Sequence, residues 1–426
     1  MSNFERKLQK RKKKYLRTSD RESSVIRRES LAYSISKNKR EKNLLKKRML
    51  PQPTSTIKIS ANFTEWEKIP LPKPVELFKY KRIFQKGTKM EIYKHLFLIR
   101  KLVSKGTKNS YNMVIASGII EELTEYLSEF DDPYLQIETV RILGHMAESN
   151  QASNRIFYEY ELIPKYIKLL NTKRTEIFEH AIWTLSSMAN FKDQYRENIL
   201  DQKGSFELIF RALKLDDFEF QMPSLRCLGN IICLSRNEID LVIEEGAIQI
   251  LVELFQNGIQ LIEEEICWIL SNICLISADH IQMLFDQKIL PLIYDKIENC
   301  GFVTKKNLIS ILSNICIKGN DIQMNQLLKY DILKLLCKNL DVDDIELSIT
   351  CLNGIKALLI YGEFYDESTQ PQKSNAISQH IRSFGGDEII LKTCYHTAKQ
   401  VTQLARVIYE TYLQNNNNNE VDIEND

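Results

Sequence analysis

Apolar residues recur along this chain with helical spacing, and one short segment shows the pattern best. In Ile266–Asn272 (ICWILSN), apolar side chains surround a tryptophan and end at an asparagine. Altered copies of this segment lie at 182–187, 225–230 and 309–314. The position that Trp268 holds recurs at 141, 183, 226, 268, 310 and 353, in steps of 42 or 43 residues. Such regularity predicts that the chain is built from repeated helical units.

A second landmark, a helix end followed by two apolar residues, repeats with the same period. It falls at Gly118, Glu161, Gly204, Gly246, Lys288 and Asp331. A period in the low forties without strand signals is typical of armadillo/HEAT repeats. We therefore predict an all-α fold, a right-handed armadillo-repeat solenoid of about eight repeats over residues 76–412. Each repeat should hold a short helix and two longer ones, with the recurring segment on the last.

The recurring segment carries candidate binding chemistry. Trp268 and Asn272 are four residues apart, so they should share one exposed side of a helix. An asparagine amide can pair with the backbone of an extended peptide, and a tryptophan face can hold a lysine stem. Glu265, one turn earlier, is placed to bind the ammonium group, as are Glu263 and Glu264 less directly. The predicted peptide-binding residues are Trp183, Arg226, Asn230, Glu265, Trp268, Asn272 and Asn314.

The alternative for these residues is that tryptophan and asparagine serve only in the core and at helix caps. For a single pair that interpretation would be preferred. Because the pair recurs in register, we favour a row of side chains along the inner face of the solenoid, about 10 Å apart as packed helices are.

Composition excludes several classes of protein. In 426 residues with a formal net charge of +2, no run of 18 apolar residues occurs, so no membrane span is expected. The start of the chain is too charged for a secretory signal peptide. The nine cysteines mostly lie among apolar residues without CxxC spacing, which favours buried, reduced thiols in the cytosol or nucleus. The six histidines are scattered and no phosphate-binding loop is present, so neither an enzyme, a metal site nor a cofactor is expected.

Charge is distributed unevenly along the chain. Residues 1–50 contain 18 Lys and Arg against 5 Asp and Glu, a net charge of +13, whereas the remainder has a net charge of −11. Residues 23–48 lack Pro and Gly, so a single helix that orders on binding is permitted there. Nucleic-acid binding or nuclear localisation is one interpretation of this basic arm. Only Phe4, Tyr15 and Tyr33 could stack on bases, which weakens the nucleic-acid version. A proline-rich linker (51–75) should follow the arm, and an acidic, disordered tail should occupy 413–426.

The arm resembles the importin-β-binding segment of the importin α family. The resemblance rests on basic residues in three clusters: Arg27, Arg28, Lys37, Lys39, Arg40, Lys46, Lys47 and Arg48. It implies that residues 1–50 bind importin β. It also implies that Lys46, Lys47 and Arg48 lie in the protein's own cargo groove when importin β is absent.

The body resembles the same family. Residues 223–231 and 242–247 look like its sixth repeat, where arginine is usual in place of tryptophan. Trp268 with Asn272, and Asn314, would then belong to the family's minor cargo site. The resemblance implies an adaptor that carries lysine-rich nuclear localisation signals and shuttles between cytoplasm and nucleus. Its implied partners are importin β, cargo proteins and a recycling exportin with RanGTP, with no membrane and no direct nucleic acid.

The chain also departs from the family pattern. It has about eight repeats where the family usually has ten. Arg141 and His145 stand where tryptophan and asparagine are expected, Ser187 replaces an asparagine, and Ser310 replaces a tryptophan. These losses motivate an alternative hypothesis, an armadillo scaffold that binds a specialised or folded partner and not ordinary localisation signals.

Overall fold

A computed structural model describes residues 63–128, 132–147, 151–191, 193–232, 236–340, 344–365 and 375–414. The basic arm, residues 51–62 of the predicted linker and nearly all of the predicted tail lie outside these ranges. Every regular element in the described residues is helical, which confirms the predicted all-α class. The described chain divides into two compact units, residues 63–251 and residues 252–414.

The helices of the first unit are α2 (Phe63–Glu67), α3 (Pro74–Lys86), α4 (Lys89–Val103), α5 (Lys108–Ala116), α6 (Ile120–Tyr126), α7 (Pro133–Ala147), α8 (Gln151–Glu159), α9 (Leu162–Leu169), α10 (Thr175–Phe191), α11 (Asp193–Asp201), α12 (Ser205–Leu213), α13 (Phe218–Ile232) and α14 (Arg236–Glu244). The boundary between the units falls inside α15 (Ala247–Asn257). The second unit continues with α16 (Gln260–Ile273), α17 (Ala278–Asp286), α18 (Ile289–Ile297), α19 (Phe302–Lys318), α20 (Asp321–Leu328), α21 (Ile332–Lys338), α22 (Ile345–Tyr365), α23 (Ala376–Ser383), α24 (Gly386–Thr393), α25 (Lys399–Ile408) and the π-helix η2 (Tyr409–Leu413).

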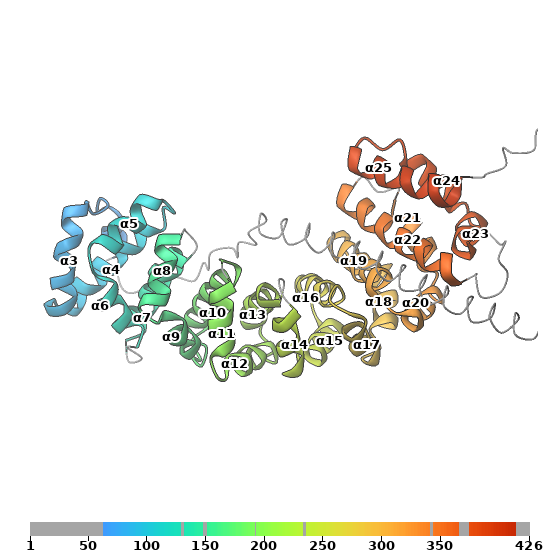
Figure 1. Ribbon diagram of the computed structural model, residues 1–426. Helices are drawn as coiled ribbons and strands as arrows, with labels where there is room; N and C mark the ends of the chain where they lie inside the picture. Colours follow the sequence, from blue (N-terminus) through green and yellow to red (C-terminus); the bar gives the residue numbers. More distant parts are fainter. Residues whose placement is uncertain are drawn as a thin grey trace, which may run out of the picture. The chain divides into compact units, whose positions relative to one another are not determined.

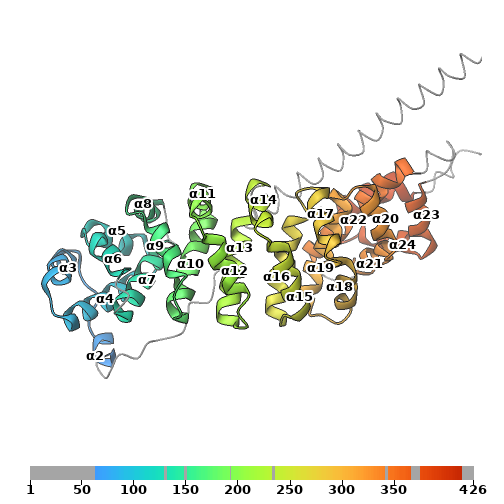
Figure 2. The same cartoon turned by 90° about the horizontal axis from the view of Figure 1, so that it is seen from below.

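The helices repeat in groups of three, and within each unit the last helix of one group packs against the last helix of the next. In the first unit α4 packs on α7, α7 on α10, and α10 on α13 (Figure 1). In the second unit α16 packs on α19, α19 on α22, and α22 on α25 (Figure 2). The described ranges thus hold eight third helices, in agreement with the predicted repeat number.

The lengths of the helices within a repeat differ from the prediction. The repeat around Trp183 has helices of 9, 8 and 17 residues, so two short helices precede one long helix. The expectation of one short and two long helices is therefore wrong. The physical reason is packing: the third helix contacts third helices on both sides and has more surface to bury.

The second sequence landmark marks a left-handed backbone turn between the first two helices of each repeat. Glu161, Lys288 and Asp331 have φ of 48°, 56° and 51°, and Gly118, Gly204, Gly246 and Gly385 have φ between 71° and 89°. One residue of positive φ reverses the chain direction and starts the second helix directly afterwards. The fold therefore requires this conformation even where the residue is not glycine.

Trp66 covers the first repeat. Its ring packs on Phe97, with centroids 5.9 Å apart, and on Leu98 of α4. The helix α2 that carries it lies within the range predicted as an extended linker, and α3 already begins at Pro74.

One described helix, α22, is long and apolar enough in the stretch Ile345–Glu363 to pass a composition test for a membrane span. Two thirds of that stretch is buried inside the protein, because α22 packs between α19 and α25. Its apolar side chains are therefore accounted for by the core.

The described cysteines are also mostly in the core, since seven of the eight are buried free thiols. Burial raises the pKa of Cys227 and of Cys337 to about 12, which keeps these thiols protonated.

Candidate functional site

The predicted binding residues lie on the third helices, and we call the row formed by the recurring position and the residue four places later the ladder. In the first unit the recurring position is Arg141 on α7, Trp183 on α10 and Arg226 on α13. In the second unit it is Trp268 on α16, Ser310 on α19 and Asn353 on α22. Each unit thus presents its own segment of the ladder on helices that pack side by side.

The ladder side chains are more covered than the sequence predicted. Trp183 is 6% exposed and Trp268 is 8% exposed, so the expectation of an open row of rings is wrong. Glu265 is 6% exposed, so its carboxylate is also largely covered. The reason is packing between neighbouring third helices: α10 lies between α7 and α13, and α16 packs against α19.

Two of the predicted asparagines tie neighbouring third helices together. Asn230 on α13 donates to the hydroxyl of Ser186 on α10, with Nδ2 and Oγ 2.8 Å apart. Asn314 on α19 donates to the backbone carbonyl of Ser271 on α16 at 2.7 Å, and it is only 1% exposed. The prediction that the Asn314 side chain faces a bound peptide is therefore wrong for its amide nitrogen, which donates a hydrogen bond within the fold.

Asn272 differs from these two asparagines. It is 8% exposed, yet its side-chain nitrogen has no hydrogen-bond partner. A buried amide donor without an acceptor costs about 1–3 kcal/mol. Asn272 therefore has hydrogen-bonding capacity that the described fold does not use, one turn after Trp268 and on the same helix side.

The glutamates before Trp268 have different roles. Glu263 forms an ion pair with Lys296 on α18 and so points away from the ladder, contrary to the weaker expectation for this residue. Glu264 accepts a hydrogen bond from Gln260 at 3.2 Å and is partly exposed. Of the three, Glu264 is the accessible carboxylate on the ladder side of α16.

At the start of the ladder, Arg141 belongs to a buried ionic network. Its Nε donates to Nε2 of His180 at 2.8 Å, and its guanidinium lies 3.4 Å from the carboxylate of Glu138. The other oxygen of Glu138 binds Arg100 at 2.6 Å. Burial, reinforced by the two arginines, lowers the pKa of His145 to about 4, so this imidazole is neutral at pH 7. At position 141, where the family pattern has an aromatic ring, this chain therefore has the guanidinium group of Arg141.

A carboxylate that sequence reasoning did not single out lies one turn before Trp183. Burial first, and the neighbouring Glu219 second, raise the pKa of Glu179 to about 6. The signal that would have found it is its spacing of four residues from Trp183, the same spacing that relates Glu264 to Trp268. Trp183 and Trp268 thus each have an acidic residue one turn earlier. Among the described residues, no group of three or more His, Cys, Asp or Glu side chains could hold a metal ion.

Comparison with known proteins connects this geometry to a family. Residues 235–275, which include Trp268 and Asn272, match the family model of the armadillo/beta-catenin-like repeat. Importin subunit alpha-6 of Arabidopsis thaliana is 26% identical over 215 residues, 48% of this chain and 38% of that relative. Importin subunit alpha-5 of the same plant is 23% identical over 486 residues, 94% of this chain and 92% of that relative.

In sequence the chain is similar to importin α subunits, from which it diverges widely. In the first three curated relatives the match spans only 38% to 50% of their length, whereas the alpha-5 subunit matches almost throughout. Solved structures agree on the armadillo-repeat fold. An engineered protein has a TM-score of 0.63 at 18% identity and covers 79% of this importin-α-like chain. A designed armadillo repeat protein in complex with the peptide (KR)4 has a TM-score of 0.51 at 20% identity. The curated relatives are importin α subunits and not enzymes, consistent with a non-catalytic protein.

Proposed function

We propose that this importin-α-like protein is a nuclear-import adaptor, which holds lysine-rich segments of cargo along its ladder and binds importin β through residues 1–50. The observation that carries the proposal is the group on α16. There a tryptophan, an asparagine with an unused N–H, and a carboxylate one turn before the tryptophan occur together on one side of a helix. The family-level similarity supports the same role.

The chemistry of this group suits an extended basic peptide. The face of Trp268 can hold the methylenes of a lysine and attract its ammonium, which is worth about 0.5–2 kcal/mol. Glu264 supplies the opposite charge at the outer end of the same side chain. Asn272 can donate its free N–H to a backbone carbonyl of the peptide, which fixes the register of the chain.

The test is a fluorescence-anisotropy titration of a lysine-rich localisation peptide against the full chain. Replacing both Trp268 and Asn272 with alanine should weaken binding at least about tenfold, because about 1.4 kcal/mol corresponds to a factor of ten. Tyr395→Ala provides the control, since this tyrosine is 78% exposed and lies outside the ladder. Equal affinities for the double variant and the control would place the binding site elsewhere.

The arm requires a separate experiment, because residues 1–50 lie outside the described ranges. Full-length protein should bind importin β at physiological salt, and replacing Lys46, Lys47 and Arg48 with alanine should weaken that binding. If these lysines and the arginine also compete for the ladder, the same variant should bind the peptide more tightly when importin β is absent. Failure of the full-length chain to bind importin β would contradict the adaptor role.

A further inference from the structure

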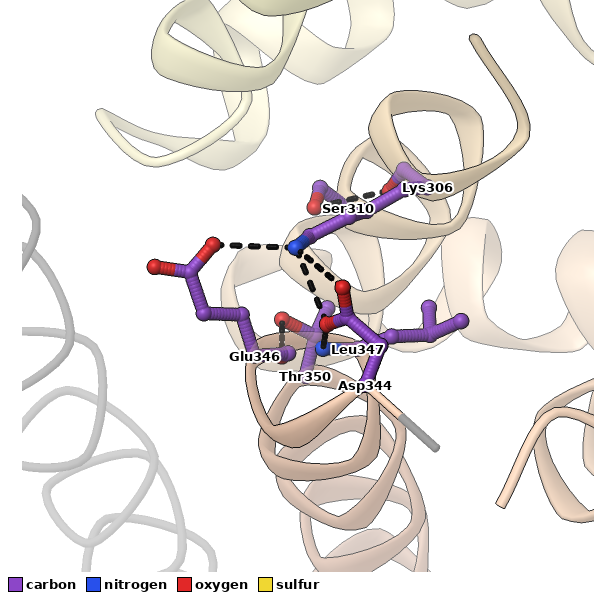
Figure 3. Close-up of polar contacts among 6 residues, drawn as sticks. All are labelled: Lys306, Ser310, Asp344, Glu346, Leu347 and Thr350. Carbon is purple, nitrogen blue, oxygen red and sulfur yellow. Dashed lines mark hydrogen bonds and ion pairs between the residues drawn. The ribbon is translucent and has the colours of Figure 1, made fainter. Parts of the chain in front are cut away.

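A lysine of the chain itself occupies an acidic site between α19 and α22. The ammonium nitrogen of Lys306 lies 2.9 Å from both carboxylate oxygens of Asp344 and 2.9 Å from Oε2 of Glu346 (Figure 3). Lys306 belongs to α19, Asp344 immediately precedes α22, and Glu346 is in its first turn. The ammonium group of Lys306 is thus bound by three charge-assisted hydrogen bonds to carboxylate oxygens.

This site lies on the ladder side of both helices. Lys306 is one turn before the ladder residue Ser310, whose hydroxyl donates to the Lys306 carbonyl at 3.0 Å (Figure 3). On α22, Glu346 is seven residues, about two turns, before the ladder residue Asn353. Spacings of four and seven residues keep these side chains on one side of a helix. Lys306 therefore has the place on α19 that Glu264 has on α16, with the charge reversed.

The carboxylate of Asp344 is held in place by a contact that does not involve the lysine. The backbone N–H of Leu347 donates to Asp344 at 2.7 Å, as in an N-terminal helix cap, and the start of a helix favours negative charge. The side chains of Lys306 and Asp344 are 24% and 23% exposed, so the pair is partly shielded from water. Burial by itself lowers the pKa of Lys306, but hydrogen bonds to Asp344 and Glu346 outweigh this and raise the pKa above its ordinary value.

We propose that Asp344 and Glu346 form a binding site for a primary alkylammonium group, and that Lys306 fills this site and excludes a lysine of a bound peptide from this end of the ladder. Lys306 is then a specificity-determining residue. The exclusion of peptide lysines rests on the proposed function, whereas the ammonium site does not. Ser310, which stands where the family pattern has a tryptophan, agrees with this assignment. If Lys306 excludes a peptide lysine from the site, a ring at position 310 would have no lysine stem to contact.

The first experiment needs no peptide. Lys306→Ala removes three methylenes and the ammonium, which n-propylammonium can replace. We expect Lys306→Ala to melt at a lower temperature than the parent chain and millimolar n-propylammonium to raise that temperature, because a ligand of the native state stabilises it. The parent chain and Lys306→Met, which keeps an uncharged side chain in the site, should not respond. Lys338→Ala is the matched control, because its lysine forms an exposed 3.9 Å pair with Glu298.

The second experiment tests exclusion with the lysine-rich peptide. Lys306→Ala should bind it at least about threefold more tightly than the parent chain, and adding Asp344→Asn should abolish the gain. If n-propylammonium stabilises Lys306→Ala no more than Lys338→Ala, the ammonium site is refuted. If the rescue succeeds and the parent chain binds the peptide, but Lys306→Ala shows no gain, the exclusion is refuted. If neither the parent chain nor Lys306→Ala binds the peptide when importin β is present to engage the arm, the exclusion and the adaptor proposal are both refuted, while the rescue still decides the ammonium site.

Discussion

The left-handed joints between the first and second helices allow backbone strain to be measured separately from side-chain contacts. Gly246 and Lys288 occupy equivalent joints, with φ of 89° and 56°. A Cβ built on Gly246 meets no atom within 4 Å, so an alanine there would cause no clash. The difference between glycine and alanine at either joint therefore reports mainly the cost of positive φ, offset by the greater freedom of glycine in the unfolded chain.

The magnitude follows from these two terms. Left-handed backbone costs a residue with a Cβ about 1–2 kcal/mol, and the extra entropy of unfolded glycine offsets about 0.5–1 kcal/mol. We expect Gly246→Ala to destabilise the protein by about 0.5–1 kcal/mol. At the other joint, Lys288→Gly should be more stable than Lys288→Ala by a similar amount. Comparing glycine with alanine at position 288 removes the contribution of the lysine side chain from both measurements.

Hydrogen exchange of the amides in α15 and α18, the helices that follow these joints, is the suitable assay. A repeat protein need not unfold in one step, so a single global free energy of unfolding can be ill-defined. The opening free energy of α15 should fall in Gly246→Ala, and that of α18 should be higher in Lys288→Gly than in Lys288→Ala. If alanine is the more stable residue at both joints, the strain argument is refuted.

Three further predictions concern the ladder. Glu138→Gln removes a buried carboxylate that binds two guanidinium groups and should lower the opening free energy of α7, measured by hydrogen exchange, by about 3–5 kcal/mol. Glu159→Gln, in an exposed pair, should lower that of α8 by less than about 1 kcal/mol, and similar losses would contradict the network. Because the pKa of Glu179 is raised to about 6, its charge opposes folding above pH 6 and less as the pH falls toward 4.5. Glu179→Gln should therefore stabilise the protein by up to about 1 kcal/mol at pH 7 and not at pH 4.5, as pH-dependent urea unfolding would show. Asn314→Ala should lower the unfolding free energy by about 1–3 kcal/mol and Asn272→Ala by less, with the reverse order in peptide affinity.

The architecture could be predicted from the sequence because the same local features recur in every repeat. The ladder position and the landmark at Gly246 and Lys288 each recur in steps of 42 or 43, and the structure places them on third helices and at left-handed joints. The helix lengths were not predictable in the same way. They depend on how much surface each helix buries against the neighbouring repeats, and a local pattern does not contain that information.

The contacts of the ladder side chains could not be predicted from spacing within one helix. Asn314 was expected to face outward because it shares a side with Ser310, but its amide reaches the backbone of α16, 43 residues earlier. Lys306 likewise meets carboxylates 38 and 40 residues later. Such contacts depend on which side chain of the adjacent helix reaches across, and so they appear only when two repeats are packed together.

Two of the four ladder positions without a ring, 141 and 310, share one physical feature. At position 141 an arginine replaces the ring and is bound by Glu138, and before position 310 Lys306 is bound by Asp344. A carboxylate beside an empty ladder position would attract any basic chain, so a resident cation neutralises it and makes that position unfavourable for a peptide lysine. By contrast, Trp183 and Trp268 keep an acidic residue one turn earlier, at Glu179 and Glu264. At these two positions the absence of a ring goes together with internal neutralisation, so we expect basic ligands to favour the parts of the ladder that still have a tryptophan.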